Sequence, residues 1–175
     1  MVDLETLGVL PNAAILTIGA VKFNRGGRLQ TLDNSDHFYH RIVIQSSLDV
    51  GLTTSPETEI WWNQQEPAIR HEAFTHNDRI PLKQSLTEFT EWFRGSGKIW
   101  GHGDDFDCVI LASAYRACGM EPPWTFWSTR DTRTLFELAG VNMRDLPAND
   151  AHHALHDAYR QVVGAKRSLE ILRRR

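Results

Sequence analysis

The sequence predicts a single α/β domain built around a mixed sheet, and three observations carry this prediction. The chain has 175 residues, an ordinary length for one domain. Segments rich in β-forming residues come first, and helices then alternate with one short apolar segment. Hydrophobic residues make up 41% of the chain and charged residues 23%, which is the composition of a folded domain rather than of a disordered chain.

Three strands are predicted in the first 44 residues. Residues 1–4 have the pattern of a strand end, and residues 13–23 (AAILTIGAVKF) form a run of β-forming residues. A Pro-Asn pair precedes this run and an Asn-Arg-Gly-Gly sequence follows it, so both of its ends are marked by turn signals. Residues 37–44 (HFYHRIVI) complete a predicted meander.

Two helices are predicted after the meander. Ser55 and Pro56 suit the N-cap and the first turn of a helix that contains Trp61 and Trp62. Residues 81–93 place apolar residues at spacings of four, three and four, which predicts an amphipathic helix.

The C-terminal half is predicted to return once to the sheet and then to continue as helices. Residues 98–101 (KIWG) indicate a short buried strand that ends at a glycine-rich turn. Gly119 and two prolines end the helix that follows this turn, and Asp150 is a possible N-cap for the last helix. The helices are expected over residues 104–118, 129–138 and 150–174.

The overall charge and the apolar runs exclude two classes of protein. Nineteen Lys and Arg against 22 Asp and Glu give a net charge of −3. A protein that coats long nucleic acid usually carries a strongly basic face, so the bulk charge gives no support to that role. A short nucleic acid held through metal ions remains compatible with the charge. The longest apolar runs stop well short of the ~20 residues that cross a bilayer, so no membrane contact is expected.

Cysteine usage and the N-terminal residues favour a cytoplasmic protein. Cys108 and Cys118 are too sparse for a disulfide scaffold, and we interpret them as buried free thiols in a reducing compartment. The acidic start of the chain lacks the basic and apolar regions of a secretory signal. The expected location is the cytoplasm, or the host cytoplasm if the protein is encoded by a phage.

The first chemical pattern is Asp3-Leu4-Glu5 at the end of the first strand. Side chains two positions apart on a strand point to the same face, so both carboxylates project together while Leu4 enters the core. Two adjacent carboxylates repel each other unless a cation lies between them, and oxygen ligands suit Mg²⁺ or Mn²⁺. A solvated acidic strand end would carry the same residues.

The second pattern lies between the strand at 98–101 and the next helix, where open α/β sheets place their sites. It contains Asp104 and Asp107. Asp104 is explained by a role as helix N-cap, and an aspartate at a helix start also suits the helix dipole. Asp107, beside Phe106 in the first turn, is less well explained in that way.

The third pattern is His152-His153-Ala154-Leu155-His156-Asp157. If His152 lies at or just before the first turn of the last helix, it can swing over a site to which Asp157 points. Three histidines in five residues suggest zinc, but the spacing matches no zinc motif and no cysteine lies nearby.

Together these patterns resemble the DEDDh superfamily of 3′-5′ exonucleases, which includes proofreading exonucleases, oligoribonuclease and ribonuclease T. The sequence is most similar to the small bacterial and phage exoribonucleases, through DLETLG at 3–8, WGHGDDFD at 100–107 and AHHALHDA at 151–158. The resemblance runs nearly from end to end. It implies a ribonuclease H-like fold, with a central mixed five-stranded sheet and helices on both faces, as one exonuclease domain over residues 1–175.

The resemblance also implies a reaction and a role for each matched residue. The reaction is hydrolysis of the terminal phosphodiester at a 3′ end by a two-metal mechanism, releasing a nucleoside 5′-monophosphate. Asp3 would bridge two Mg²⁺ or Mn²⁺ ions, Glu5 and Asp157 would complete the sphere of the ion that holds the attacking water, and Asp107 would act on the other ion. His152 would be the general base.

The expected substrate is a single strand or a short 3′ overhang, with RNA favoured over DNA. Backbone N–H groups after the first strand are placed to meet the 3′-hydroxyl, and aromatic side chains, including one of Trp61 and Trp62, are candidates for stacking on bases. His102, where close relatives often have Asn, is expected to tune substrate contact. The residues expected to contact substrate are Thr6, Leu7, Gly8, Trp62, His102 and Phe106.

Other interpretations remain open. The enzyme could act on DNA, the same carboxylates could hydrolyse small phosphate esters, or the fold could serve as a degenerate binding module. The remaining tryptophans are assigned to packing or to a subunit interface, as in a homodimer.

Overall fold

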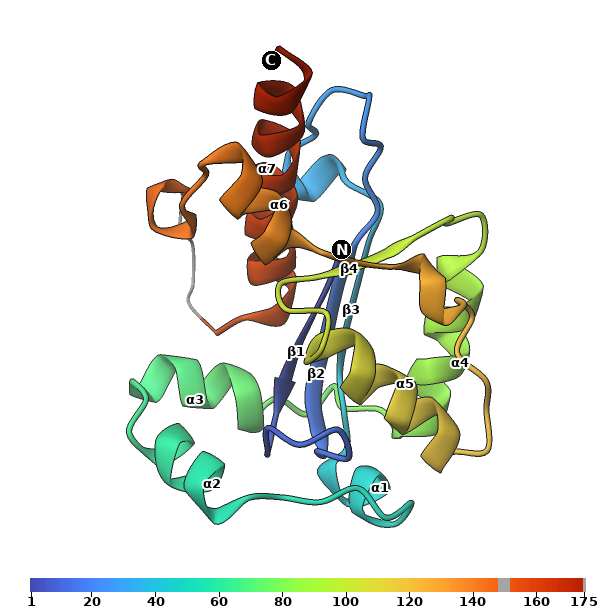
Figure 1. The fold of residues 1–175 in the computed structure, drawn as a ribbon. Helices are drawn as coiled ribbons and strands as arrows, with labels where there is room; N and C mark the ends of the chain where they lie inside the picture. Colours follow the sequence, from blue (N-terminus) through green and yellow to red (C-terminus); the bar gives the residue numbers. More distant parts are fainter. Residues whose placement is uncertain (148–151, 175) are drawn as a thin grey trace.

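The computed structural model describes residues 1–147 and 152–174, which form a mixed α/β fold (Figure 1). An antiparallel sheet has the strand order β1-β2-β3, and a second sheet is a parallel pair of β4 and β5. The strands are β1 (Val2–Thr6), β2 (Ile15–Val21), β3 (His37–Arg41), β4 (Ile99–Gly101) and β5 (Thr129–Asp131). The predicted meander is therefore confirmed, although β3 ends at Arg41 and does not reach residue 44.

The expectation of one five-stranded sheet has to be corrected. β4 packs against β1, but no ladder of hydrogen bonds joins these two strands among the described residues. The Leu4 N–H donates to Oδ1 of Asp107 at 3.1 Å, so an amide at the free edge of β1 bonds to a side chain instead of a neighbouring strand. The described strands consequently form sheets of three and two.

Helices occupy most of the remaining chain, with short 3-10 turns η1 (Leu32–Asn34), η2 (Phe126–Ser128) and η3 (Met143–Asp145) between them. The helices are α1 (Ile44–Leu48), α2 (Pro56–Asn63), α3 (Pro67–Phe74), α4 (Leu82–Phe93), α5 (Asp107–Ala117), α6 (Thr132–Ala139) and α7 (Ala154–Arg173). The predicted N-cap of α2 is confirmed, because Oγ of Ser55 accepts from the Thr58 N–H. The helices α1 and α3 were not predicted.

Three predicted helices begin later than expected, and one of them, α7, begins at Ala154, with His153 at its N-cap, instead of at residue 150. The helix α5 begins at Asp107, with Phe106 at its N-cap, so the interpretation of Asp104 as N-cap is wrong. A turn precedes the helix, in which the Phe106 N–H donates to the Gly103 carbonyl at 3.0 Å. The segment expected to be helical from residue 129 begins as the strand β5, and α6 follows it. The proposed cap Asp150 lies outside the described residues.

The antiparallel sheet separates two apolar clusters, one on each face. Alternate residues of β2, such as Ile18, pack with α4 and α5. On the other face, Val21 packs with α6 and α7. Between these residues Gly19 lies against the start of α7, where a Cβ atom would be 2.2 Å from the Leu155 nitrogen. The sheet therefore holds the N-terminal end of α7 at backbone contact.

Two further expectations can be compared with this fold. Cys108 and Cys118 are both buried and free, as predicted. Within the described part of the chain, every helix is too short or too polar to span a bilayer.

Candidate active site

Three carboxylates from two distant parts of the chain meet at one point. Asp3 and Glu5 lie on β1, and Asp157 lies in the first turn of α7. One carboxylate oxygen from each lies within 4.8 Å of the other two. Leu4, between the two strand carboxylates, is 5% exposed and belongs to the core on the opposite face. The alternation of the strand thus produces the pair that the sequence predicts.

Asp107 joins this group from the start of α5. Its side chain is buried, and its Oδ1 accepts the Leu4 N–H described above. The negative charge of Asp107 acts on both Asp3 and Glu5 and raises their pKa values. The structure therefore brings together all four carboxylates that the sequence analysis selected.

Burial and mutual repulsion favour the protonated, neutral forms of these carboxyl groups. Burial, followed by the charge of Asp107, raises the pKa of Asp3 well above its ordinary value. Burial and the charge of Asp157 raise the pKa of Glu5 to about 8. Burial also raises the pKa of Asp107 to about 7 and raises the pKa of Asp157. Such raised pKa values indicate that the ionised carboxylates lack a nearby positive charge, which a bound cation would supply.

The chemistry of the donor set fits a divalent cation. Among the described residues, no ion pair joins any of the four carboxylates to a basic side chain. Gln161 donates from Nε2 to Oδ1 of Asp3 at 2.6 Å, while its own Oε1 is buried and has no hydrogen-bond partner in the described structure. Several carboxylate oxygens beside an unpaired buried acceptor suit hard cations such as Mg²⁺ or Mn²⁺ and their bound waters.

His152 lies just before α7 with a backbone φ of 57°. This left-handed conformation is uncommon for a residue other than glycine, and it costs about 1–3 kcal/mol unless the surroundings impose it. The imidazole meets the Trp61 ring edge to face, with 4.9 Å between ring centroids, and lies 6.4 Å from the Trp62 ring. These contacts hold His152 just before the first turn of α7, which carries Asp157.

The segment after β1 is less accessible than the sequence analysis expected. The side chains of Thr6 and Leu7 are buried, and the Leu7 N–H already donates to the Ala14 carbonyl. A backbone contact to a 3′-hydroxyl would therefore need another amide of residues 6–8. Trp62 is 2% exposed and donates from Nε1 to the Thr6 carbonyl at 2.9 Å, whereas Trp61 is 39% exposed. Of the two indoles, Trp61 has the surface for stacking.

His102 and Phe106 make internal contacts. Nδ1 of His102 lies 2.9 Å from Oγ1 of Thr132, and its ring is tilted against Phe136. Burial and the charge of Arg133 lower the pKa of this imidazole. Phe106 packs against the core that contains α5. A role in substrate contact stays a prediction for both residues.

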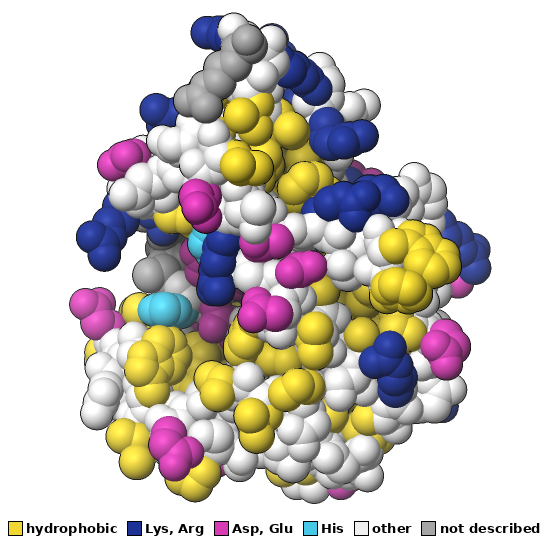
Figure 2. Space-filling view, viewed as in Figure 1, with side chains coloured by type: hydrophobic (Ala, Val, Ile, Leu, Met, Phe, Trp, Pro, Cys, Tyr) yellow, Lys and Arg dark blue, Asp and Glu magenta, His cyan; other side chains and the backbone are white. Residues whose placement is uncertain are grey.

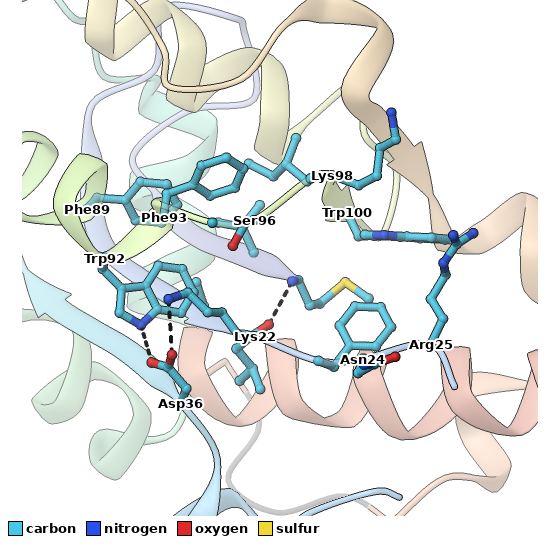
Figure 3. A pocket seen from close by; sticks show the side chains of 18 of the residues that line it. Lys22, Asn24, Arg25, Asp36, Phe89, Trp92, Phe93, Ser96, Lys98 and Trp100 are labelled. Carbon is cyan, nitrogen blue, oxygen red and sulfur yellow. Dashed lines mark hydrogen bonds and ion pairs between the residues drawn. The ribbon is translucent and has the colours of Figure 1, made fainter. Parts of the chain in front are cut away.

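Two cavities differ in whether residues predicted to contact substrate line them. One of about 640 Å³ lies between α2 and α3, and Leu7 and Trp62 are part of its wall. The other, of about 550 Å³, is lined by no predicted site residue. Figure 3 shows this second cavity, where Trp92 and Lys22 both bind Asp36. These contacts support a packing role for Trp92.

Sequence reasoning missed two groups of residues around the site. Gln161 lies one helical turn after Asp157, and that spacing of four was a signal that could have found it. His153 and His156, to which the sequence analysis assigned no role in the reaction, are half-buried and stack with 4.1 Å between their ring centroids. Glu72, the partner of His153, comes from α3, a helix that was not predicted, so no sequence signal pointed to it.

The comparison with known families follows this geometry. A family model described as the 3′-5′ exoribonuclease Rv2179c-like domain matches residues 1–168. This range includes the four carboxylates and His152. No curated protein matches the chain.

Proposed function

Because the chain belongs to the Rv2179c-like 3′-5′ exoribonuclease family, we propose that it is a metal-dependent exonuclease that removes nucleoside 5′-monophosphates from 3′ ends. The observation that carries this proposal is the convergence of Asp3, Glu5 and Asp157 within 4.8 Å, with Asp107 beside them. We further propose that residues 1–175 form one DEDDh-type exonuclease domain with a ribonuclease H-like arrangement, acting in the cytoplasm.

The four carboxylates would hold two Mg²⁺ or Mn²⁺ ions. Bound there, divalent ions supply Lewis-acid chemistry, which offsets phosphate charge and makes water a better nucleophile at neutral pH. The chain carries a net charge of −3, so it has no overall attraction for an anionic substrate. Metal ions at this cluster would supply the positive charge that binds the phosphates. The raised pKa values of the carboxylates support the need for such charge.

The chain's own residues would then divide the remaining work. His152 would accept the proton from the attacking water, because imidazole is suited to general-base work and this one lies close enough to Asp157 to act electrostatically on that carboxylate. Gln161 would orient Asp3 through the 2.6 Å hydrogen bond. Trp61 would stack on a base of the substrate at the exposed edge of α2.

Single-stranded RNA is the proposed substrate class, with DNA as the alternative that the test must separate. The family description supports RNA. The same reaction on DNA differs only in the 2′-hydroxyl, to which no contact in this structure can be assigned.

The test uses 5′-labelled single-stranded RNA and DNA of matched sequence, each with a free or a phosphorylated 3′ end. A ladder that shortens from the free 3′ end with Mg²⁺ or Mn²⁺, and stops with EDTA, is the expected result. Asp107→Asn should abolish the ladder, whereas Asp105→Asn, an exposed neighbour, should leave it intact. If folded, metal-binding protein shortens neither oligomer, the exonuclease proposal fails and a binding module or a small-ester hydrolase replaces it.

We also propose that the chain forms a homodimer through the surface around η2. Phe126 and Trp127 are 80% and 64% exposed and pack on each other, beside a groove of about 600 Å³ lined by Val109 and Trp124. In Figure 2 hydrophobic side chains protrude where η2 runs in the matching view of Figure 1. An aromatic pair next to a groove is self-complementary, as a twofold interface requires.

Light scattering tests the dimer. Trp127→Glu should give a monomer that keeps the circular dichroism spectrum of wild type, whereas Leu48→Glu, a substitution of an exposed apolar residue on α1, should leave the dimer intact. A wild-type monomer at micromolar concentration would contradict the proposal.

A further inference from the structure

Glu72 on α3 lies at the centre of a polar cluster that joins three separate elements. Its Oε1 accepts hydrogen bonds from the Tyr39 hydroxyl at 2.6 Å and from Nε of Arg41 at 3.1 Å, both on β3. The same oxygen lies 3.4 Å from Nε2 of His153, the residue before α7. His76 contacts the other carboxylate oxygen at 3.0 Å. One carboxylate thus connects β3, α3 and the start of α7.

Aromatic stacking reinforces this connection at His153. The Tyr39 ring lies parallel to the His153 ring at 4.5 Å, and the His156 ring stacks on the opposite side at 4.1 Å. The His153 side chain is only 14% exposed. Glu72 beside Nε2 and the two stacked rings therefore restrict the movement of the His153 side chain.

The charge of Glu72 suits a permanent anchor. Burial acts to raise its pKa, but the hydrogen bonds from Tyr39 and Arg41 outweigh burial and lower that pKa below its ordinary value. Glu72 is therefore a carboxylate at neutral pH, and the Arg41 guanidinium, 13% exposed, balances its charge. The contacts of Glu72 with Tyr39 and Arg41 therefore do not depend on protonation of the histidines.

His152, the neighbour of this fixed residue, has the left-handed backbone described above. Such a conformation persists only where the contacts on both sides impose it. On one side His153 is held by Glu72, and on the other the Trp61 ring meets the His152 imidazole edge to face. Both contacts come from the hairpin of α2 and α3, which Figure 1 shows together at the lower left of the molecule.

We infer that Glu72 is a positioning residue for His152: by fixing His153 against β3, it holds His152 at the carboxylate cluster. The inference rests on the proposed function, in which His152 accepts a proton. Glu72 itself touches neither substrate nor metal ligand in this inference. Its effect should therefore fall on the turnover rate more than on substrate affinity.

Kinetics of four proteins test this inference: wild type, Glu72→Ala, Glu72→Gln and Glu66→Ala. Displacing a proton acceptor by about 1 Å costs up to about 100-fold in rate, so Glu72→Ala should lower kcat by about 10–100-fold with KM within about twofold. Glu72→Gln keeps an oxygen that accepts from Tyr39, and should recover most of the loss. Glu66, exposed at the N-cap of the same helix, is the matched control and its variant should behave as wild type.

A double-mutant cycle separates positioning from a general structural effect. In a His152→Ala background, Glu72→Ala should cause no additional loss of kcat, because the residue through which it acts is already gone. An additional loss equal to that seen in the wild-type background would overturn the inference. If Glu72→Ala does not fold, Tyr39→Phe replaces it in the cycle, since this change keeps the stacked ring and removes one hydrogen bond to Glu72.

A measurement without substrate makes the inference independent of the exonuclease proposal. The imidazole signals of His152, assigned by their loss in His152→Ala, should shift in NMR spectra of the Glu72→Gln and Tyr39→Phe proteins and stay in place in Glu66→Ala. Unchanged His152 signals in both cluster variants would contradict the positioning role. A wild-type protein that degrades no oligomer while these signals shift would reject the proposed reaction alone.

Discussion

At the residue scale, the carboxylate cluster places four acidic side chains so close together that a bound cation is needed to stabilise their ionised forms. Each acid is at least partly buried, and each has a raised pKa. Without a cation, the folded protein binds protons at this site that the unfolded chain releases. The cluster therefore couples folding to both pH and metal.

The first prediction concerns the stability of the metal-free protein. The folded-state pKa of Glu5, about 8, lies above its ordinary value of 4.5, so stability falls as pH rises through this window and levels off above it. In EDTA, the melting temperature should drop between pH 5 and pH 8, by about 2–4 °C for each kcal/mol lost. Glu5→Gln should drop less, and Glu66→Gln should match wild type. Added Mn²⁺ should restore stability most at pH 8, and a melting temperature that rises with pH in EDTA would refute the coupling.

Gln161 gives the second prediction. Its hydrogen bond orients Asp3, and loss of such a supporting contact typically lowers metal affinity by about 10–100-fold. Gln161→Ala should show this weakening in calorimetric titrations with Mn²⁺ while its circular dichroism spectrum stays that of wild type. Gln84→Ala, on the exposed face of α4, is the control. Equal affinities of the two variants would show that Asp3 needs no such support.

The sequence could predict the acidic residues of the site but not what surrounds them. Asp3 and Glu5 follow from strand alternation, and Asp157 from its place in the first turn of a helix. The hydrogen bond of Gln161 to Asp3 joins residues 158 positions apart, and the position of Glu72 depends on how α3 docks. The spacing of Gln161 from Asp157 indicates a shared helix face but not the contact with Asp3, which arises from tertiary packing. Glu72 has no local pattern, because its position depends on that packing alone.

At the element scale, the short elements escaped prediction for an identifiable reason. The strand β5 has three residues, Thr129, Arg130 and Asp131, and none of their side chains is apolar. A strand this short shows no period-two pattern, and it runs directly into the amphipathic α6. The helix α3 is mostly exposed, so it lacks the apolar stripe by which α4 was predicted.

Gly19 carries the third prediction, because it sets the distance between β2 and α7. A Cβ atom at this position would overlap backbone atoms of Ala154 and Leu155, which cannot move without moving the helix. Gly19→Ala should destabilise the protein by about 1–3 kcal/mol in urea unfolding. It should also weaken metal binding, because the displaced segment carries Asp157. Gly97→Ala, where a Cβ atom meets open space, should change neither property.

Asp131 carries the fourth prediction. Its carboxylate caps α6 by accepting from the Arg133 and Thr134 N–H groups and also accepts from the Gly103 N–H at 2.9 Å. Asp131→Ala should cost about 0.5–2 kcal/mol in chemical denaturation, the usual effect of losing an N-cap. Asp145→Ala in η3 serves as the control. A variant as stable as wild type would mean that water replaces the cap without loss.

At the scale of the whole molecule, the charge balance limits how the protein can hold nucleic acid. With 19 Lys and Arg against 22 Asp and Glu, the chain has no excess of basic side chains to neutralise phosphates over a long strand. The logarithm of the binding constant falls linearly with the logarithm of the salt concentration. Each neutralised phosphate contributes about −0.9 to this slope on a duplex, or about −0.7 on a single strand.

The fifth prediction follows from that balance. RNA binding by the His152→Ala protein with Mg²⁺, followed by fluorescence anisotropy, should show a slope shallower than about −2, as for no more than about three phosphate contacts. Binding should vanish in EDTA at every salt concentration. A slope of about −5 or steeper would reveal a basic path for the strand that the charge balance does not suggest.

The division of the apolar interior into two clusters affects the order in which parts of the protein unfold. The sheet separates the layer of α6 and α7, which carries Asp157 and Gln161, from the layer of α5, which carries Asp107. Amide hydrogen exchange in many proteins shows that such layers open separately, at less cost than unfolding of the whole. Either opening would separate the proposed metal ligands while the other layer stays folded. On warming, catalytic activity should therefore be lost at a lower temperature than the circular dichroism signal of the backbone. The amides of β2, a strand that contacts both layers, should be the last to exchange.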